Sequence, residues 1–209
     1  MSTESTPGKP VRGRPPTITP QRIADAGIRM GLPNISMAAM ARALGVTQMA
    51  LYKRAANLQA VKQLVAAEIF LRWPLPRAGA DGDAAEALDA YLMRFVDALC
   101  RMVRTHPGLP PYLLRRSAAT TAMLDKISEH QAHVAAVHGL PLDRARWLLA
   151  TLAFHCIAGA DTVFLLADDG DATEAPQRAE NAEVIAEFMQ GMHALVIGSL
   201  QLLRSDSSD

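Results

Sequence analysis

Apolar residues recur every three or four positions along most of the chain, which is the spacing that places them on one face of a helix. In the first third of the chain this pattern predicts three short helices and a longer fourth one. The residues before them, Thr19, Ser36, Thr47 and Asn57, can each cap a helix. Gly27, inside the first helix, costs about 1 kcal/mol relative to Ala unless another helix packs closely there. The predicted helices cover residues 21–30, 37–43, 48–54 and 58–70.

Longer apolar-periodic segments follow a Gly/Asp turn region at residues 77–83 and continue to residue 203. They predict helices over about 84–105, 111–116, 120–138, 143–167 and 179–203. We therefore expect an all-α fold, with an N-terminal three-helix domain and a C-terminal helical bundle. The predicted division is a flexible basic arm at 1–16, a first domain at 17–72 that includes the linking helix, and a bundle domain at 82–204.

The composition agrees with helices packed on helices. Half of the 209 residues are hydrophobic and a fifth are charged, so the chain can bury a full core. Aromatic residues make up only 5%, and β-branched runs are scarce, which argues against an all-β sandwich. The two cysteines, Cys100 and Cys156, fit no C-x-x-C spacing, so they indicate neither a disulfide scaffold nor a cysteine-only zinc site. The N-terminus has no apolar core of signal-peptide type, and we expect a cytoplasmic protein.

The charges are unevenly placed along the chain, although the formal net charge is zero. Residues 1–72 hold ten Lys and Arg residues against three acidic ones, which gives a charge of +7 and leaves −7 for the remainder. A basic N-terminal third suggests a domain that binds a polyanion, although solvated charges can also fall this way by chance.

The stretch from Ser36 to Tyr52 has the spacing of a helix-turn-helix. This motif needs a small residue where the two helices cross, a glycine in the turn four residues later, and apolar residues that pin the second helix to the first. Ala41 and Gly45 meet the first two needs. The apolar set is Met40, Leu44, Val46 and Leu51. The alternative is an ordinary helical hairpin that has this spacing by accident.

A second helix pinned in this way points polar side chains outward, where they can meet DNA. Gln pairs with adenine edges, Met packs on a thymine methyl, and Lys or Arg reaches guanine or phosphate. Thr47 at the helix start and Tyr52 are placed to hydrogen-bond backbone phosphates. The predicted DNA-binding residues of this motif are Thr47, Gln48, Met49, Tyr52, Lys53 and Arg54.

Residues 17–65 resemble the tetracycline-repressor (TetR) family of bacterial transcriptional regulators. The resemblance is carried by Ile23, Ala26, Gly31, Met40-Ala41, Leu44-Gly45-Val46, Leu51-Tyr52 and Val61. It implies a helix-turn-helix DNA-binding domain followed by a variable helical domain for ligand binding and dimerisation. It also implies a homodimer on a double-stranded DNA operator with two half-sites, and release from DNA when a small-molecule effector binds. A repressor is the family's common mode.

The chain departs from the family's pattern just after the tyrosine. The family usually has a His-Phe pair there and a lysine at the start of the fourth helix, whereas this chain has Arg54, Ala55 and Leu58. The aromatic plug and one phosphate-seeking charge are missing, and Arg54 can substitute for the charge. The alternative function is therefore a TetR-like small-molecule-binding helical protein with a degenerate head that no longer binds operators.

Arg12 and Arg14 lie in the proline-bounded arm before the first helix. A short basic arm of this kind can enter the minor groove of A·T-rich DNA, where narrow walls concentrate the negative potential. We count both arginines among the predicted DNA-binding residues, with a solubilising tail as the alternative.

The last two predicted helices carry apolar residues in a three-four rhythm, so two chains could pair them in a four-helix interface. Residues 147–167 are long enough to span a bilayer, but Asp161 in this stretch and the lack of aromatic-basic flanks argue against a membrane. We expect a homodimer, and the alternative is that both helices line the core of a monomer. The predicted interface residues are Leu152, Gly159, Val163, Phe188, Met192 and Leu195.

The bundle is rich in Leu, Ala and Met and poor in aromatics, which predicts a mostly apolar ligand cavity between residues 84 and 167. We expect it where helices diverge around Pro107-Gly108 and Pro110-Pro111. His155 and Asp161 interrupt the least charged helix and are the predicted ligand-binding residues. The alternative for both is a satisfied hydrogen bond in the core or interface.

Metal and enzyme chemistry find little support in the sequence. His130 and His133 lie one turn apart with Glu129 beside them, but no further ligand is identifiable from spacing, so no metal and no cofactor are predicted. The chain has no G-x-S-x-G, Walker loop, G-x-G-x-x-G after a strand, or H-E-x-x-H. We therefore predict no enzyme activity.

Overall fold

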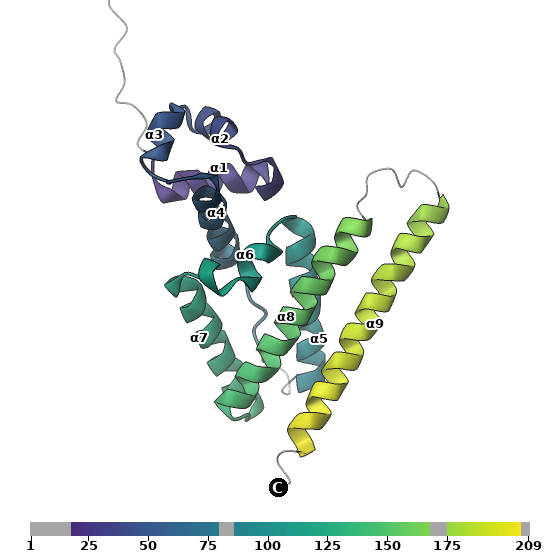
Figure 1. Cartoon of the computed structure of the whole chain (residues 1–209). Coiled ribbons are helices and arrows are strands. Elements are labelled where there is room, and N and C mark those ends of the chain that lie inside the picture. The colour runs from purple at the N-terminus through teal and green to yellow at the C-terminus, as the bar shows by residue number, and fades with distance from the viewer. Residues whose placement is uncertain (1–17, 80–85, 168–174, 206–209) are drawn as a thin grey trace, which may run out of the picture.

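The computed structural model describes residues 18–79, 86–167 and 175–205. Over these residues it consists of helices joined by turns, and the all-α prediction is confirmed (Figure 1). The N-terminal head, residues 18–72, contains α1 (Pro20–Met30), the 3-10 turn η1 (Leu32–Asn34), α2 (Met37–Leu44), α3 (Gln48–Tyr52) and α4 (Leu58–Arg72). The body contains α5 (Leu88–Thr105), α6 (Pro110–Leu114), η2 (Arg116–Ala118), α7 (Thr121–His138), α8 (Leu142–Ala167) and α9 (Ala175–Ser205).

Each of the four α-helices of the head begins at a side chain that caps it. The capping oxygen accepts a hydrogen bond from the backbone N–H three residues further on, over 2.8–3.2 Å. These bonds satisfy donors that a helix start otherwise leaves without a partner. The four caps are the predicted ones, Thr19, Ser36, Thr47 and Asn57.

The head is closed by a tight crossing of α1 and α4 at Gly27. A Cβ atom at this position would lie 2.3 Å from Val65 Cγ2 and 3.2 Å from Ile35 Cδ1. Another helix therefore packs closely at Gly27. This is the condition under which we expected the cost of a glycine inside α1 to be offset. The crossing covers a core in which Met40 and Leu51 have no exposed surface.

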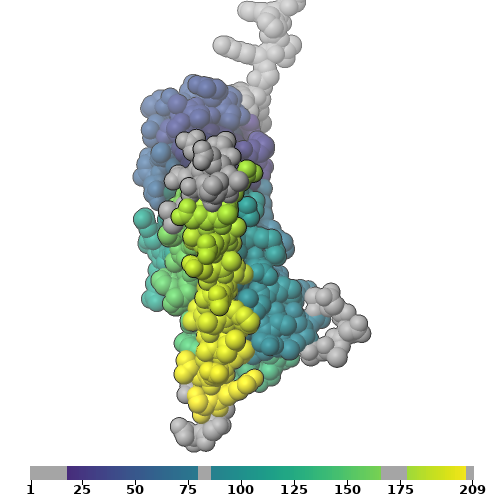
Figure 2. All heavy atoms as spheres, turned by 90° about the vertical axis from the view of Figure 1, so that its right-hand side faces the viewer, coloured from purple at the N-terminus to yellow at the C-terminus, as the bar shows by residue number. Residues whose placement is uncertain are grey.

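The body is a bundle around α8, which packs against α5, α7 and α9. Figure 1 shows α7 and α9 on opposite sides of α8, and Figure 2 shows α9 running down one face of the body. By length and composition, residues Leu142–Leu165 of α8 could cross a membrane. The central helix of a bundle meets the same criteria because its neighbours demand apolar positions on several sides.

The helix α4 joins the head to the body. It packs on α1 within the head and on α6 and α7 within the body. Gln63 Nε2 donates a hydrogen bond to the carbonyl oxygen of Ala118 over 3.3 Å. The Tyr112 hydroxyl donates to Gln59 Oε1, also over 3.3 Å. The middle of α4 is therefore hydrogen-bonded to α6 and to the turn after it.

Candidate DNA-binding surface and ligand cavity

The helices α2 and α3 form a helix-turn-helix. The helix α2 ends at Gly45, whose φ of 70° lies in the left-handed region that glycine adopts without a steric penalty. Beyond this turn Leu51 is fully buried, and it belongs to the same apolar core as Leu44 of α2, which is 4% exposed. The turn and the buried leucines fix the direction of α3 and leave its other side open to solvent.

The predicted DNA-binding residues within the described part of the chain are all exposed. Met49 is 69% exposed and Tyr52 is 44% exposed, so both side chains are accessible on the open side of α3. The helix α3 ends at Tyr52, two residues earlier than predicted, so Lys53 and Arg54 belong to the turn before α4. Arg12 and Arg14 lie outside the described residues.

Apolar side chains occupy two of the three positions where the chain departs from the TetR pattern, and the third is the exposed Arg54. Ala55 is 7% exposed and belongs to the core of the head, and Leu58 packs against that core. The core therefore closes without the aromatic plug, whereas the positive charge at the start of α4 is not replaced by Leu58.

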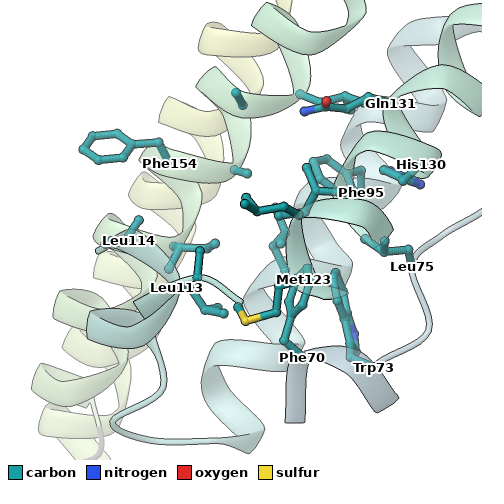
Figure 3. A pocket seen from close by; sticks show the side chains of 18 of the residues that line it. Phe70, Trp73, Leu75, Phe95, Leu113, Leu114, Met123, His130, Gln131 and Phe154 are labelled. Atoms are coloured by element: carbon teal, nitrogen blue, oxygen red, sulfur yellow. The ribbon is translucent and has the colours of Figure 1, made fainter. Parts of the chain in front are cut away.

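The body contains a mostly apolar cavity of about 280 Å³, as predicted, but it does not lie at the predicted place, because neither Pro107-Gly108 nor Pro110-Pro111 lines it. Its walls come from α5, α6, α7 and α8, with Leu113, Met123 and Phe95 among the side chains that point into it (Figure 3). The cavity also reaches beyond the predicted range, because Phe70 and Trp73 at the end of α4 form one wall. A ligand in this space would touch the helix that carries the head.

Polar groups lie at the edge of the cavity. Arg115 and Arg116, between α6 and α7, are exposed cations on its lining. His130 is another lining residue, and its Nε2 lies 3.0 Å from the Tyr91 hydroxyl. Burial lowers the pKa of His130 to about 4, and the neighbouring His133 adds to the shift. The imidazole is therefore neutral at physiological pH.

His155 and Asp161 lie outside this cavity. His155 is exposed, and its Nδ1 donates a hydrogen bond to the Thr151 carbonyl oxygen over 2.8 Å. Asp161 is half-buried beside Arg104 at a small depression of about 30 Å³, and burial raises the pKa of its carboxyl group. The hydrogen bond of His155 is therefore made within its own helix at the surface and not in the core, and neither side chain lines the 280 Å³ cavity.

Lys126 on α7 holds the C-terminal end of α4, a role that sequence reasoning missed. Its ammonium group donates hydrogen bonds to the carbonyl oxygens of Phe70 over 3.0 Å and Leu71 over 2.8 Å, and also to that of Trp73. A cation is favoured there because the last carbonyls of a helix carry partial negative charge. The pKa of Lys126 is lowered by burial. The only sequence signal is a lysine beside apolar residues of its helix, which is common on any amphipathic helix.

Four of the predicted interface residues make their contacts within one chain. Leu152 has no exposed surface and Met192 is 4% exposed, so both belong to the core of the body. The ring of Phe188 covers Gly159 so closely that a Cβ there would lie 2.5 Å from Phe188 Cε2. These residues hold α9 against α8, as the monomer-core alternative expected for them.

Other apolar residues of α8 and α9 remain at the surface. An open groove between the two helices is lined by Trp147, Leu195 and Leu202. Leu202 is 56% exposed and Ile197 is 46% exposed. The two remaining predicted interface residues, Val163 and Leu195, are partly buried.

Comparison with known proteins identifies the fold. The sequence matches no protein-family model and no curated protein. The structure is similar to a TetR variant from Acinetobacter baumannii AYE in complex with minocycline, with a TM-score of 0.63, 16% identity, and coverage of 90% of this chain and 99% of that one. It is also similar to the TetR family protein ActR from Streptomyces coelicolor in complex with (S)-DNPA, with a TM-score of 0.65, 18% identity, and coverage of 88% and 98%. The chain has the fold of TetR-family transcriptional regulators, and the resemblance given by its sequence is confirmed as a similarity of fold.

Proposed function

We propose that the protein is a cytoplasmic, sequence-specific DNA-binding regulator that represses transcription and leaves its operator when a small molecule enters the cavity. The observation that carries this proposal is α4, which packs into the head at one end and lines the cavity at the other. A protein with only a ligand-binding role has no need for an exposed helix-turn-helix connected to its cavity in this way.

The exposed side of α3 supports major-groove binding. A short helix that is fixed by a preceding helix can enter the major groove with its polar residues toward base edges. Gln48 is proposed to pair with adenine and Met49 to pack on a thymine methyl, while Lys53 and Arg54 reach guanine or phosphate. The proposed backbone contacts are Thr47 and Tyr52, and the proposed minor-groove contacts are Arg12 and Arg14.

A two-fold homodimer would give the operator two half-sites. The exposed Ile197 and Leu202, and the groove beside Trp147, are the surface that we propose the partner covers. A pair of helices from each chain can close a four-helix interface over such a surface. Two heads then address half-sites about 34 Å apart, or a multiple of one helical turn.

The effector is proposed to be an amphipathic molecule with an apolar body. The cavity lining is mostly apolar, while Arg115 and Arg116 provide positive charge at its edge, where an anionic group would bind. Two proteins with this fold contain bound small molecules, minocycline in TetR and actinorhodin or (S)-DNPA in ActR. We propose that the present cavity also takes a small molecule, of a chemistry set by its own side chains.

Binding in the cavity would act on the head through three contacts with α4. Lys126 holds the C-terminal carbonyls of α4, Ala118 accepts from Gln63, and Tyr112 donates to Gln59. A ligand that displaces Phe70 shifts α4 relative to these anchors and changes the spacing of the two heads. The ligand must bind the shifted conformation more tightly, because a ligand with equal affinity for both conformations does not change their populations.

A gel-shift experiment tests the DNA-binding proposal. The purified protein is offered the DNA upstream of its own gene, with unrelated DNA as competitor at a stated salt concentration. Gln48→Ala should cost about 1–3 kcal/mol at the cognate site and relax base preference there. Arg146→Ala, which removes an exposed cation from α8, serves as the matched control and should leave binding unchanged. Equal affinity for the upstream region and bulk DNA favours the alternative of a degenerate head.

Sedimentation tests the dimer independently of DNA. Ile197→Glu should dissociate the dimer at micromolar concentration because it places a charge in the proposed interface. Leu142→Glu, at an exposed position on α8 outside the groove, should leave the dimer intact. A wild-type protein that sediments as a monomer under these conditions contradicts the proposed interface.

A screen of amphipathic molecules tests the coupling. Effectors should raise the melting temperature and release the DNA together, because they bind the folded state and shift α4. Two probes that are identical except that one has a carboxylate and the other an amide show whether Arg115 and Arg116 select an anion. Ligands that stabilise the protein without changing DNA binding would count against the coupling.

A further inference from the structure

Three sulfur atoms meet inside the body, each from a different helix. Cys100 Sγ on α5 lies 3.4 Å from Cys156 Sγ on α8 and 3.9 Å from Met189 Sδ on α9. The chain has two cysteines in 209 residues, 56 positions apart, and the fold brings both to one point. Both are free thiols.

The spacing of the sulfur atoms matches the ligand shell of a metal ion. With metal–sulfur bonds of about 2.3 Å, three ligands in a plane around one ion lie about 4 Å apart. The separation between Cys100 Sγ and Met189 Sδ is 3.9 Å, and that between the two Sγ atoms is 3.4 Å, so a side-chain rotation that moves the thiols apart would open a three-coordinate position. A disulfide would use only two of them and would have to draw the two Sγ atoms to about 2.05 Å within a packed core.

The ligand set selects the class of metal. Two thiols and a thioether are soft ligands, which favour Cu(I), whereas Mg²⁺, Ca²⁺ and Mn²⁺ require oxygen ligands. Among the described residues no group of three His, Cys, Asp or Glu side chains is placed to hold a metal ion. A fourth ligand of the kind that structural zinc requires is therefore not supplied by those side chains.

We propose that Cys100, Cys156 and Met189 form a binding site for a soft monovalent cation, Cu(I), between α5, α8 and α9. The ion forms one bond to each sulfur, and the two thiols release their protons to solvent. The complex carries a charge of −1, because two thiolates surround one Cu⁺ and the thioether is neutral. The oxidation state of the metal does not change. The site is separate from the proposed DNA contacts and effector, and it does not depend on them.

The surroundings of the cluster hold the three ligands in place. Cys156 has no exposed surface, and its thiol also lies 3.6 Å from the Val96 carbonyl oxygen. Phe188, adjacent to Met189, packs over Gly159, three residues after Cys156, which keeps α9 close to α8 beside the sulfur atoms.

The electrostatics of the two thiols differ. The hydrogen bond with Cys156 is the main cause that lowers the pKa of Cys100, whereas the same contact and burial raise the pKa of Cys156. Of the nearby charges, Asp97 raises the pKa of Cys100 and Arg101 lowers it by less.

Competition for Cu(I) under anaerobic conditions tests the site. The reduced full-length protein is titrated against the coloured Cu(I) complex of bicinchoninate, and loss of colour measures transfer of the ion. We expect one ion per chain, an increase in melting temperature, and the release of two protons in weakly buffered solution. X-ray absorption should find three sulfur neighbours around the ion. The proposal is overturned if the reduced wild-type protein removes no Cu(I) from bicinchoninate at concentrations at which other buried thiolate sites remove it.

Variants separate the contributions of the three ligands. Met189→Leu conserves the size of the side chain and should weaken Cu(I) binding at least tenfold. Met192→Leu, at a buried methionine on the same helix, is the matched control and should bind as the wild type does. Cys100→Ser and Cys156→Ser should each abolish the three-sulfur signature, with circular dichroism used to compare their folds. Equal affinity of the two methionine variants, or two sulfur neighbours in the wild-type absorption spectrum, overturns the three-ligand site even if a cysteine variant does not fold.

Discussion

The head and the body are both made of amphipathic helices around apolar cores, but they differ in how tightly the helices approach. In the head, α1 and α4 meet so closely at Gly27 that a Cβ would overlap Val65. In the body, α5 to α8 stand far enough apart to leave a cavity of about 280 Å³. Close packing makes the head a fixed support for α3, whereas the cavity gives the body room to rearrange.

The helix α4 takes part in both kinds of packing. Its Val65 closes the tight crossing with α1, and five residues later Phe70 lines the cavity. Under the proposed function, a ligand that displaces Phe70 would act on the head through this one helix and not through loops. The tightly packed head and the cavity of the body are therefore connected by one shared helix, α4.

The largest expected effect comes from breaking the tight crossing. Gly27→Leu should lower the free energy of unfolding by about 3 kcal/mol, because the new side chain overlaps Val65 and Ile35. DNA binding should be lost as well, since the crossing supports the helix-turn-helix. Ala90→Leu, at an exposed position on α5, is the control of equal size. Urea unfolding and gel shifts measure both effects, and wild-type behaviour of Gly27→Leu would show that the head is not tightly packed.

The sequence predicted the head in detail because local chemistry determines most of it. Thr47 caps α3 and Gly45 adopts the left-handed turn, and both signals are readable from residue type alone. The end of α3 was predicted two residues late, because Lys53 and Arg54 continue the polar pattern into the turn before α4, where the Lys53 N–H still donates to the Met49 carbonyl oxygen over 3.3 Å. The helices of the body were predicted equally well, from apolar periodicity and from proline and glycine at their ends.

The contacts between helices of the body could not be predicted from one sequence. His155 and Asp161 stand out in an apolar helix, yet the rotation of α8 leaves both outside the cavity. Leu152 was assigned to the dimer surface, whereas α5 and α9 bury it in the core. Lys126 finds its partners 53 to 56 residues away, and periodicity carries no information about such distances.

The second prediction loosens the end of α4. Lys126→Met keeps the length of the side chain but removes its hydrogen bonds to the α4 carbonyls. We expect a loss of about 1–3 kcal/mol in the free energy of unfolding, the cost of removing a charged donor from its partners. Effector-dependent release of DNA should also weaken, because α4 loses an anchor. Arg146→Met removes an exposed cation instead and should change neither quantity; an equal effect of both variants would assign the loss to charge alone.

A third, smaller effect is a pH dependence that arises in the body. The pKa of His130 is lowered by burial from 6.5 to about 4. Between these values the unfolded chain binds more protons than the folded one, so stability should fall as the pH decreases from about 6.5 to 4 and stay constant above. His130→Gln should reduce this fall, whereas His193→Gln, at an exposed position of α9, should not. The head has no histidine between residues 18 and 72 and cannot contribute to it. If His130→Gln and the wild type have the same urea midpoint at each pH, His130 is not the source of the pH dependence.

The smallest effect distinguishes two glycines of the body and shows where it is packed as tightly as the head. A Cβ at Gly159 would lie 2.5 Å from the Phe188 ring, whereas a Cβ at Gly191 on α9 would meet no atom within 4 Å. Gly191→Ala should therefore raise the free energy of unfolding by about 0.5–1 kcal/mol, the difference in helix propensity. Gly159→Ala gains the same propensity but must displace Phe188, so its net effect should be a loss. Urea unfolding of the two variants decides the matter. If both variants are more stable than the wild type, Phe188 moves aside at little cost. Tight packing in this molecule is then confined to its head.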